Sequence, residues 1–441
     1  MVEGQKHEST KMAWRLCAFL ALCAPVLLSG GRAERREATY EFRLARAAEV
    51  ALRLRASAPG TSWQEPGAEA AVVRLDLDGR YNQHVTLFHG AQTHEYRLLL
   101  GALGPGGHRL RARLDRKLSS RGADSFEAEL AVEAFEPGSS EYQAIRRAPI
   151  LSARPDTLGR ATDTPLLAYY EWLPAPPDAP AGTARKLQYT YIFSNEDGGT
   201  NTTQLMARWG RTVDTEYVYY LLLDEAGNVL REIIQGVNHK ETPFRGKRMA
   251  LHPLIGVASK NNIFSGRPAS RVRMALWPEP ADLSQHSREE LLDRHPWTYR
   301  IMAQELEREG KLKEIADPRR FLYIEAHIRT SGAAASFGVA LKDGRVFRSD
   351  RDRADLRIER SGWVRSALEL PAGTALADIA HLLFHCHPPA KPPRPEPAER
   401  FCSVTAIPKF FFLDENYRPG PANSVQRALP ARLSPGQDVS F

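Results

Sequence analysis

Residues 186–193 read KLQYTYIF, and this short stretch decides the fold class. Leu187, Tyr189, Tyr191 and Phe193 stand at every second position, so one face of an extended segment carries only large hydrophobic side chains. A period of two is that of a half-buried β-strand. The sequence therefore predicts a strand with one face in a core, and a chain that is mainly β.

Upstream, residues 38–136 contain several shorter stretches with the same period, separated by Gly, Pro and polar residues. That spacing is typical of a β-sandwich of about 100 residues. The sequence predicts a β-sandwich accessory module over residues 34–137. The Pro, Gly and Ser content of EPGSSEYQ indicates a boundary, and we assign a linker to residues 138–147.

Downstream, the strands become longer and more aromatic, and we expect a larger β-sandwich-like domain over residues 148–425. A turn at Asp224 to Asn228 predicts a hairpin. Ser287 and Glu290 have the spacing of a capping box, and the helical period that follows predicts a helical insertion over residues 287–316. The Pro, Ser and Gly of residues 426–441 predict a flexible tail.

The N-terminus has the composition of an export signal. Basic residues precede an apolar run from Leu16 to Leu28, and small residues follow, so we expect a signal peptide over residues 1–33. An uncleaved anchor is the alternative, but the run is shorter than the roughly 20 residues of a membrane span. No later segment is apolar enough to cross a bilayer, so we expect a secreted or periplasmic protein.

Charge and cysteine content narrow the function classes. The chain has 60 Lys and Arg against 53 Asp and Glu, without a basic cluster, so we do not expect nucleic-acid binding. Two of its four cysteines fall in the expected signal. Cys386 and Cys402 remain, and in an exported chain such a pair predicts a disulfide, with two free thiols as the alternative.

No phosphate-binding Gly loop, HExxH or G-x-S-x-G motif occurs in the chain. The densest polar region runs from residue 194 to 264, where side chains at strand ends and loops are typical of functional sites. Its catalytic candidates are Asp214, Glu216, His239 and His252. Its ligand-binding candidates are Asn195, Asp197, Arg208, Arg211, Glu241, Asn261 and Asn262.

Asp214 and Glu216 would lie on the same face of a strand, about 7 Å apart along it, which suits paired carboxylate acid/base chemistry. The alternative is ion pairing of both with Arg208 and Arg211. Asn195 and Asp197 lie in a glycine-containing loop that offers oxygen ligands for calcium, but it lacks the spacing of a twelve-residue calcium loop, and a plain turn is the better interpretation.

Residues 381–387 read HLLFHCH, a metal-like pattern. In an extended strand His381, His385 and His387 share one face, where imidazoles can bind zinc or copper. Same-face neighbours stand about 6.6 Å apart, so all three could bind one ion only if the strand bends. The alternative is a polar strand face without a metal. We expect no cofactor, with zinc, copper or calcium as open alternatives.

Trp63 lies in the loop APGTSWQEPG, whose polar and turn-forming neighbours predict an exposed side chain.

Three blocks resemble a known family: residues 147–172, 209–230 and 252–262, which begin RAPILSARP, WGRTVDTEY and HPLIGVASK. Over residues 147–265 the chain is similar to the vacuolar-protein-sorting-like family of uncharacterised β-rich proteins. The family's Gly-Asp-Trp-Glu core is replaced here by residues 212–217, and its usual His by Asn261 and Asn262. The resemblance implies a sheet-rich fold and no established activity.

Three hypotheses about function follow. The first is an exported, non-catalytic protein that binds a glycan or another cell-envelope component. The second is a secreted carbohydrate-active hydrolase that uses paired carboxylates. The third is a periplasmic metal-binding protein.

Overall fold

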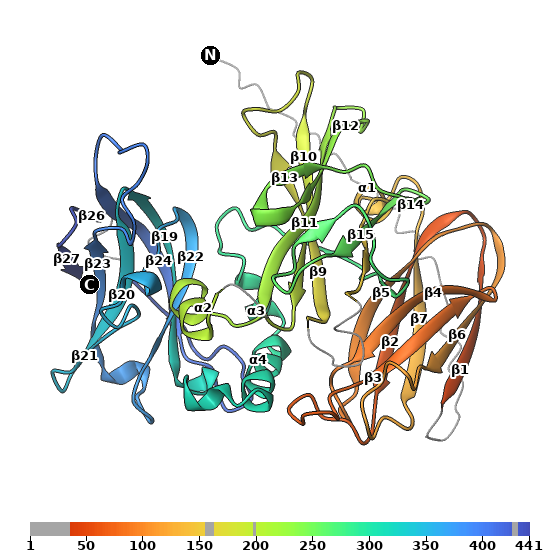
Figure 1. Cartoon of the computed structure of the whole chain (residues 1–441), viewed down its shortest axis with the longest axis horizontal. Coiled ribbons are helices and arrows are strands. Elements are labelled where there is room, and N and C mark those ends of the chain that lie inside the picture. The colour runs from red at the N-terminus through yellow and green to blue at the C-terminus, as the bar shows by residue number, and fades with distance from the viewer. Residues whose placement is uncertain (1–35, 155–162, 197–199, 426–430) are drawn as a thin grey trace, which may run out of the picture. The chain divides into compact units, whose positions relative to one another are not determined.

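The computed structural model describes residues 36–154, 163–196, 200–425 and 431–441. The expected signal peptide and Asp197 lie outside the described residues. The described chain is mainly β, as predicted, and its strands form six sheets (Figure 1).

The first two sheets form the N-terminal β-sandwich that the strand spacing predicts (Figure 1, red to orange). Their orders are β1-β6-β3-β4 and β5-β2-β7. The strands are β1 (Glu37–Leu44), β2 (Ala48–Ser57), β3 (Ala71–Leu77), β4 (Arg80–Leu87), β5 (His94–Leu103), β6 (Gly106–Leu114) and β7 (Glu127–Phe135). In β2, Leu52 and Leu54 are buried while Arg53 and Arg55 face solvent and pair with acidic residues of β7. Alternation with period two therefore places one face of each strand in the core.

The middle part holds a six-stranded sheet, β13-β12-β11-β10-β9-β18, and a smaller sheet with the path β14-β15-β8-β17. The strands are β8 (Ile150–Ser152), β9 (Pro165–Pro174), β10 (Arg185–Phe193), β11 (Asp214–Leu223), β12 (Val229–Gln235), β13 (Glu241–Pro243), β14 (Arg248–Met249), β15 (His252–Val257), β16 (Phe264–Ser265), β17 (Arg273–Met274) and β18 (Glu279–Pro280). Leu187, Tyr189, Tyr191 and Phe193 are all completely buried on one face of β10. The expected hairpin is β11 with β12.

The third part is a C-terminal sandwich (Figure 1, cyan to blue). Its sheets follow the paths β22-β19-β24-β25 and β21-β20-β23-β27. The strands are β19 (Phe321–Ser331), β20 (Ala334–Leu341), β21 (Val346–Arg348), β22 (Gly362–Glu369), β23 (Ile379–His387), β24 (Phe401–Phe411), β25 (Asn423–Val425), β26 (Ala431–Leu433) and β27 (Asp438–Ser440). The predicted disulfide joins Cys386 of β23 to Cys402 of β24, one strand from each sheet.

Helices are few and short. They are α1 (Tyr142–Ile145), α2 (Thr202–Trp209), α3 (Glu290–Arg294) and α4 (Trp297–Arg308), with 3-10 turns η1 (Val237–His239), η2 (Lys311–Lys313), η3 (Pro318–Arg320), η4 (Ala354–Leu356) and η5 (Leu376–Asp378). The helical insertion lies where we expected it, but the capping box does not form. Ser287 instead binds the carboxylate of Glu325 through both its amide and its hydroxyl.

Hydrophobic contacts divide the chain differently from our sequence boundaries. One core cluster runs from the N-terminal sandwich through the middle part and α4, and a second fills the C-terminal sandwich. The expected main domain of residues 148–425 therefore contributes to two cores. The expected tail also differs, because its described residues supply β26 and β27, which pair with β24 and β23.

Trp63 is a correction, because the side chain that we expected to be exposed is buried. Its indole Nε1 donates to Glu305 at 3.0 Å, and the guanidinium of Arg308 lies 4.8 Å from its ring centroid. These contacts fix the loop of the N-terminal sandwich to α4. Burial of the large indole ring stabilises the folded state, and the polar neighbours of Trp63 in sequence did not reveal this. In the described residues no helix is long and apolar enough to cross a membrane.

Candidate functional site

Two acidic residues meet at the start of β11. Helix α2 ends at Gly210, which has φ 64° and so adopts a left-handed conformation that favours glycine. Asp214 follows four residues later with 1% of its surface exposed, and it accepts a hydrogen bond of 2.9 Å from Nδ2 of Asn262. Burial and the charge of Glu216 raise the pKa of Asp214 to about 8. At neutral pH Asp214 therefore holds its proton.

Glu216 is the partner nearer to solvent, with 16% of its side chain exposed. It accepts a hydrogen bond from Nε2 of Gln235, and its Oε2 lies 3.9 Å from Nδ1 of the exposed His239. Burial raises the pKa of Glu216 as well. The pair therefore combines a buried proton donor with a carboxylate that solvent reaches.

The alternative that both carboxylates pair with Arg208 and Arg211 is not what the geometry shows. Nε of Arg211 donates to Glu289 at 3.0 Å, and another nitrogen donates to the carbonyl of Val213. The guanidinium of Arg208 stacks on Trp209 at 4.5 Å from its centroid. Neither arginine forms an ion pair with the two carboxyls, and the charge of Arg211 only partly offsets the burial that raises their pKa values.

Of the other candidates from the polar region, Asn262 and Asn195 lie together beside Asp214, and the rest are dispersed. Asn195 is buried, and its backbone carbonyl lies 3.4 Å from Nδ2 of Asn262. Asn261 lies beside Ser259 in the loop before Asn262. His252 is buried between the carbonyl of Ala148 and the carboxylate of Glu49, so its contacts are with other parts of the chain.

A group of polar and aromatic side chains beside Glu216, which sequence reasoning missed, forms what we call the Tyr217 face. Its members are Glu171, Lys186, Gln188, Glu216, Tyr217, Tyr220, Glu241 and Arg288. Glu171, Gln188 and Tyr220 are direct neighbours across β9, β10 and β11, so they share one sheet face. They lie on the face of KLQYTYIF opposite the core, as does Tyr217, which pairs with Thr190, whereas Glu216 pairs with Tyr191 and acts on Tyr217 through its charge.

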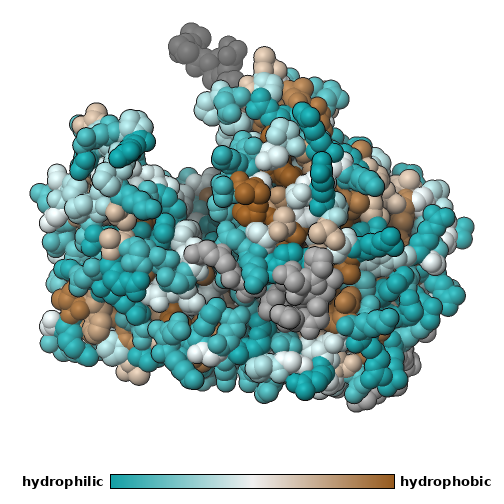
Figure 2. All heavy atoms as spheres, in the orientation of Figure 1, coloured by the Kyte–Doolittle hydropathy of each residue, from teal (hydrophilic) through white to brown (hydrophobic). Residues whose placement is uncertain are grey.

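On the Tyr217 face, aromatic rings lie in contact with both a cation and a carboxylate. Nζ of Lys186 lies 3.9 Å from the ring centroid of Tyr220, whose hydroxyl donates to Glu241 at 2.7 Å. Tyr217 is half-buried. Its pKa is raised to about 12, mainly by burial and to a smaller extent by the charges of Glu241 and Glu216. Tyr217 is therefore a neutral ring under the electrostatic influence of two carboxylates. Figure 2 shows a mainly hydrophilic surface in which hydrophobic side chains form separate small patches.

The three histidines of β23 do not converge on one point. His381 is exposed, whereas the ring centroids of His385 and His387 are 6.0 Å apart. Nε2 of His387 lies 2.9 Å from Oγ of Ser336 and 3.4 Å from the buried carboxylate of Asp350. Because both partners share one ring nitrogen, this is not a Ser-His-Asp triad, in which they occupy different nitrogens.

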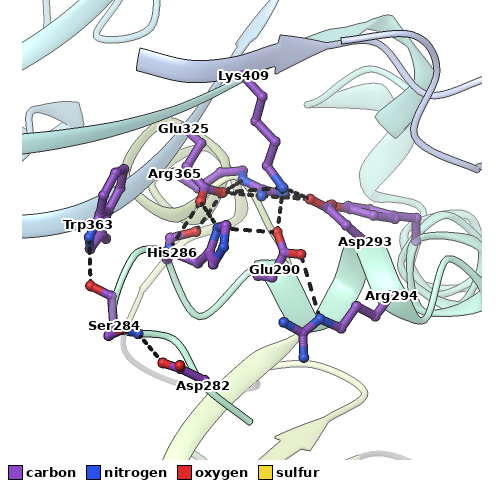
Figure 3. A network of polar contacts seen from close by, with 12 residues as sticks. Asp282, Ser284, His286, Glu290, Asp293, Arg294, Glu325, Trp363, Arg365 and Lys409 are labelled. Carbon is purple, nitrogen blue, oxygen red and sulfur yellow. Dashed lines mark hydrogen bonds and ion pairs between the residues drawn. The ribbon is translucent and has the colours of Figure 1, made fainter. Parts of the chain in front are cut away.

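One group of three potential metal ligands does assemble within the described residues. The ligand atoms of His286, Glu290 and Glu325 lie within 4.8 Å of one another. Figure 3 shows that Lys409 and Arg365 already reach these carboxylates. Nζ of Lys409 lies 2.5 Å from Oε2 of Glu290, and Arg365 pairs with Glu325. Fixed cations therefore balance the charge that a metal ion would balance.

Comparisons with known proteins find little. No family model and no curated protein matches the chain. A ruminal GH26 endo-beta-1,4-mannanase matches at TM-score 0.17 and 6% identity, over 24% of this chain and 19% of the enzyme. PNGF-II matches at TM-score 0.15 and 15% identity, over 22% of this chain and 23% of that protein. The chain thus spans about a fifth of the length of each, and similarities of this size establish neither fold nor activity.

Proposed function

We propose that this protein is an exported, non-catalytic binding protein that takes a saccharide of the cell envelope on the Tyr217 face. The observation that supports the proposal is a half-buried, neutral tyrosine ring that interacts electrostatically with Glu216, Glu241 and Arg288. A disulfide such as Cys386–Cys402 is typical of extracytoplasmic proteins.

The chemistry of the face suits a saccharide. A sugar ring offers an apolar C–H face and a rim of hydroxyl groups, and an aromatic ring with a few placed polar groups can meet both. Glu241 and Arg288 are exposed, and Lys186 is half-buried. Charged donors and acceptors make the stronger hydrogen bonds. The face thus offers acceptors and donors around one stacking ring.

The hydrolase hypothesis fits the geometry less well. Glycosidases use two carboxyl groups that both reach the scissile bond. Asp214 is 1% exposed and bound to Asn262, so only Glu216 of the pair can touch a substrate. A single accessible carboxylate beside an aromatic ring supports binding rather than paired acid/base chemistry.

Binding is tested with the full chain on an array of cell-envelope and plant glycans, followed by calorimetry on the best hit. We expect Tyr217→Ala to weaken that hit at least about tenfold, equivalent to about 1.4 kcal/mol. The matched control is Tyr40→Ala, since Tyr40 is a half-buried tyrosine of β1. No glycan hit, or equal binding by Tyr217→Ala and the wild type, would overturn the proposal.

A second assay separates binding from hydrolysis. The bound glycan is incubated with the protein and the release of reducing ends is measured. We expect no release above a heat-inactivated sample. Release that disappears in Glu216→Gln but persists in Tyr40→Ala would replace the binding proposal by the hydrolase hypothesis.

A further inference from the structure

A cavity of about 280 Å³ lies apart from the Tyr217 face, and none of the functions considered above uses it. Its walls come from β4 and β5 of the N-terminal sandwich, from β9, from residues 274–277, and from the start of α4. Backbone bonds hold these walls together, since the amide of Leu99 donates to Ala275 and that of Trp277 donates to Arg97. The walls of this partly open cavity are therefore held in place by the fold.

We propose that this cavity binds a small, neutral aromatic molecule that carries one hydrogen-bonding group. The proposal is independent of the saccharide site.

The size of the cavity suits one or two fused rings. A cavity of about 150 Å³ lined by aliphatic and aromatic side chains accepts benzene. At about 280 Å³ this cavity has room for a bicyclic molecule.

The walls are apolar and aromatic. The aliphatic lining residues are Val85, Leu98, Leu166, Leu167, Ala168, Met274 and Leu276. Phe88 and Trp297 stack with centroids 5.6 Å apart, and Phe88 meets Tyr96 edge-on at 5.1 Å. Aromatic walls favour a ring that can stack or meet them edge-on.

The charged lining groups already lie beside opposite charges, although Nε of Arg97 has no hydrogen-bond partner among the described residues. The carboxylate of Glu279 lies 3.1 Å from Arg97 and 2.9 Å from His295. Glu95 lies 3.9 Å from Arg53, and His84 lies 3.2 Å from Asp115. A charged ligand would lose its hydration without gaining a counter-ion, which is costly in such surroundings. The lining therefore selects a neutral molecule.

His94 supplies the polar feature of the cavity. In the described part of the chain no hydrogen bond joins its ring to another residue, although it stacks on His89 at 3.9 Å and meets Trp297 at 4.8 Å. Burial, with the neighbouring His89 and His295, lowers the pKa of His94 to about 2, so its ring is neutral. A neutral imidazole offers one donor and one acceptor. A hydroxyl or ring N–H on the ligand can bind there.

The test uses calorimetry and thermal shift on the full chain with four probes. Indole and 2-naphthol are neutral aromatic molecules with one donor, benzoate is an aromatic anion, and glucose is a neutral polyol. We expect saturable binding of indole or 2-naphthol, at least about tenfold weaker binding of benzoate, and none of glucose at this site. Absence of saturable binding by both neutral aromatics would overturn the proposal.

Two variants fill the cavity from different walls: Ala168→Phe on β9 and Met274→Phe on β17. Each should weaken the binding of 2-naphthol at least about tenfold. Val346→Phe is the matched control, because Val346 is 53% exposed on β21 and lies outside the cavity lining. Equal binding by a folded filling variant and the control would contradict the assignment.

If both filling variants fail to fold, a crystal of the wild type soaked in 2-naphthol decides the question. We expect density for the ring against Trp297, with the hydroxyl at His94. Ordered water alone in the cavity would overturn the proposal. Tyr217→Ala should bind 2-naphthol as the wild type does. The result for the aromatic cavity is therefore independent of the result for the saccharide site.

Discussion

Two buried groups of carboxylates in this chain differ in what surrounds them. In the network of Figure 3, Glu325 and Asp293 lie against the guanidinium of Arg365, and Lys409 contacts Asp293 at 2.6 Å. At the start of β11, Asp214 and Glu216 lie against the amides of Asn262 and Gln235. The first group forms ion pairs with cations, and the second accepts its hydrogen bonds from neutral amides.

The difference decides the charge of each group. Burial by itself would raise the pKa of Asp293, but Arg365 and Lys409 more than offset it and hold the pKa below its usual value. Burial and the charge of Glu216 raise the pKa of Asp214 to about 8. Fixed cations thus make a buried acid a structural ion pair, whereas neutral donors leave it able to titrate.

The largest effect should come from breaking the cationic network. Arg365 is fully buried and reaches Glu325, Asp293 and the hydroxyl of Tyr299. We expect Arg365→Met to lower the free energy of unfolding by about 3–5 kcal/mol, because it leaves the buried carboxyl groups of Glu325 and Asp293 without that partner. Chemical denaturation measures the change.

The matched control is Arg345→Met, which removes an arginine from a solvent-exposed pair with Asp343 and should have little effect. A loss in Arg365→Met no larger than that of the control would show that the network is not structural.

The second prediction concerns the pH dependence of Asp214, whose folded pKa lies above its unfolded value of 3.8. Between these two values the unfolded chain releases this proton while the folded chain keeps it, so the contribution of Asp214 to stability falls as pH rises from about 4 to about 8. Asp214→Asn removes this contribution. Between pH 5 and pH 8 the free energy of unfolding of the variant should rise by at least about 1.4 kcal/mol relative to that of the wild type. This change is equivalent to one pKa unit.

Denaturation midpoints across this pH range give the measurement. Asp343→Asn is the control, because Arg345 holds the pKa of Asp343 below 3.8, outside the window. If the difference in free energy of unfolding between Asp214→Asn and the wild type is the same at pH 5 and at pH 8, Asp214 is ionised in the folded chain over this range.

A smaller effect is expected from Glu216→Gln. The change removes the negative charge that helps raise the pKa of Asp214, so the pH dependence should become shallower. Because solvent reaches Glu216, we expect the free energy of unfolding at pH 7 to change by about 1 kcal/mol or less. The slope of stability against pH, compared with that of Asp214→Asn, reports the coupling. An unchanged slope would show that the two carboxyls titrate independently.

The smallest effect should come from metal removal. Since Lys409 and Arg365 already balance Glu290 and Glu325, we expect neither a chelator nor added Zn²⁺ to shift the melting temperature of the wild type. His286→Ala should behave in the same way. Stabilisation by Zn²⁺ that His286→Ala abolishes would show that the network holds a metal after all.

Local patterns were enough to predict the strands and the disulfide. The period of KLQYTYIF places four side chains in the core without reference to any other residue. Cys386 and Cys402 were the pair remaining after the expected signal, and the structure joins them. Helix α2 was missed although its signals are local: Asn201 and Gln204 form a capping box, and Gly210 ends the helix.

The candidate site was predicted only in part. Asp214 and Glu216 share a strand, so their proximity follows from their spacing. Asn262 and Gln235 come from other elements, and the sequence did not indicate that the arginines beside Asp214 would engage Glu289 and Trp209 instead. His252 looked like a member of the same polar region, but its partner Glu49 lies about 200 residues away in sequence.

The sequence by itself determined that this chain is built of strands, because a period of two acts between neighbours along one segment. It also supplied the alternating Lys, Gln and Thr of KLQYTYIF, which became the second face of β10. Only the tertiary structure decided which buried acids have cations, where Trp63 packs, and that β4, β5 and β9 enclose a cavity. Those outcomes depend on contacts between distant segments, and burial and charge pairing at such contacts are set by packing rather than by spacing.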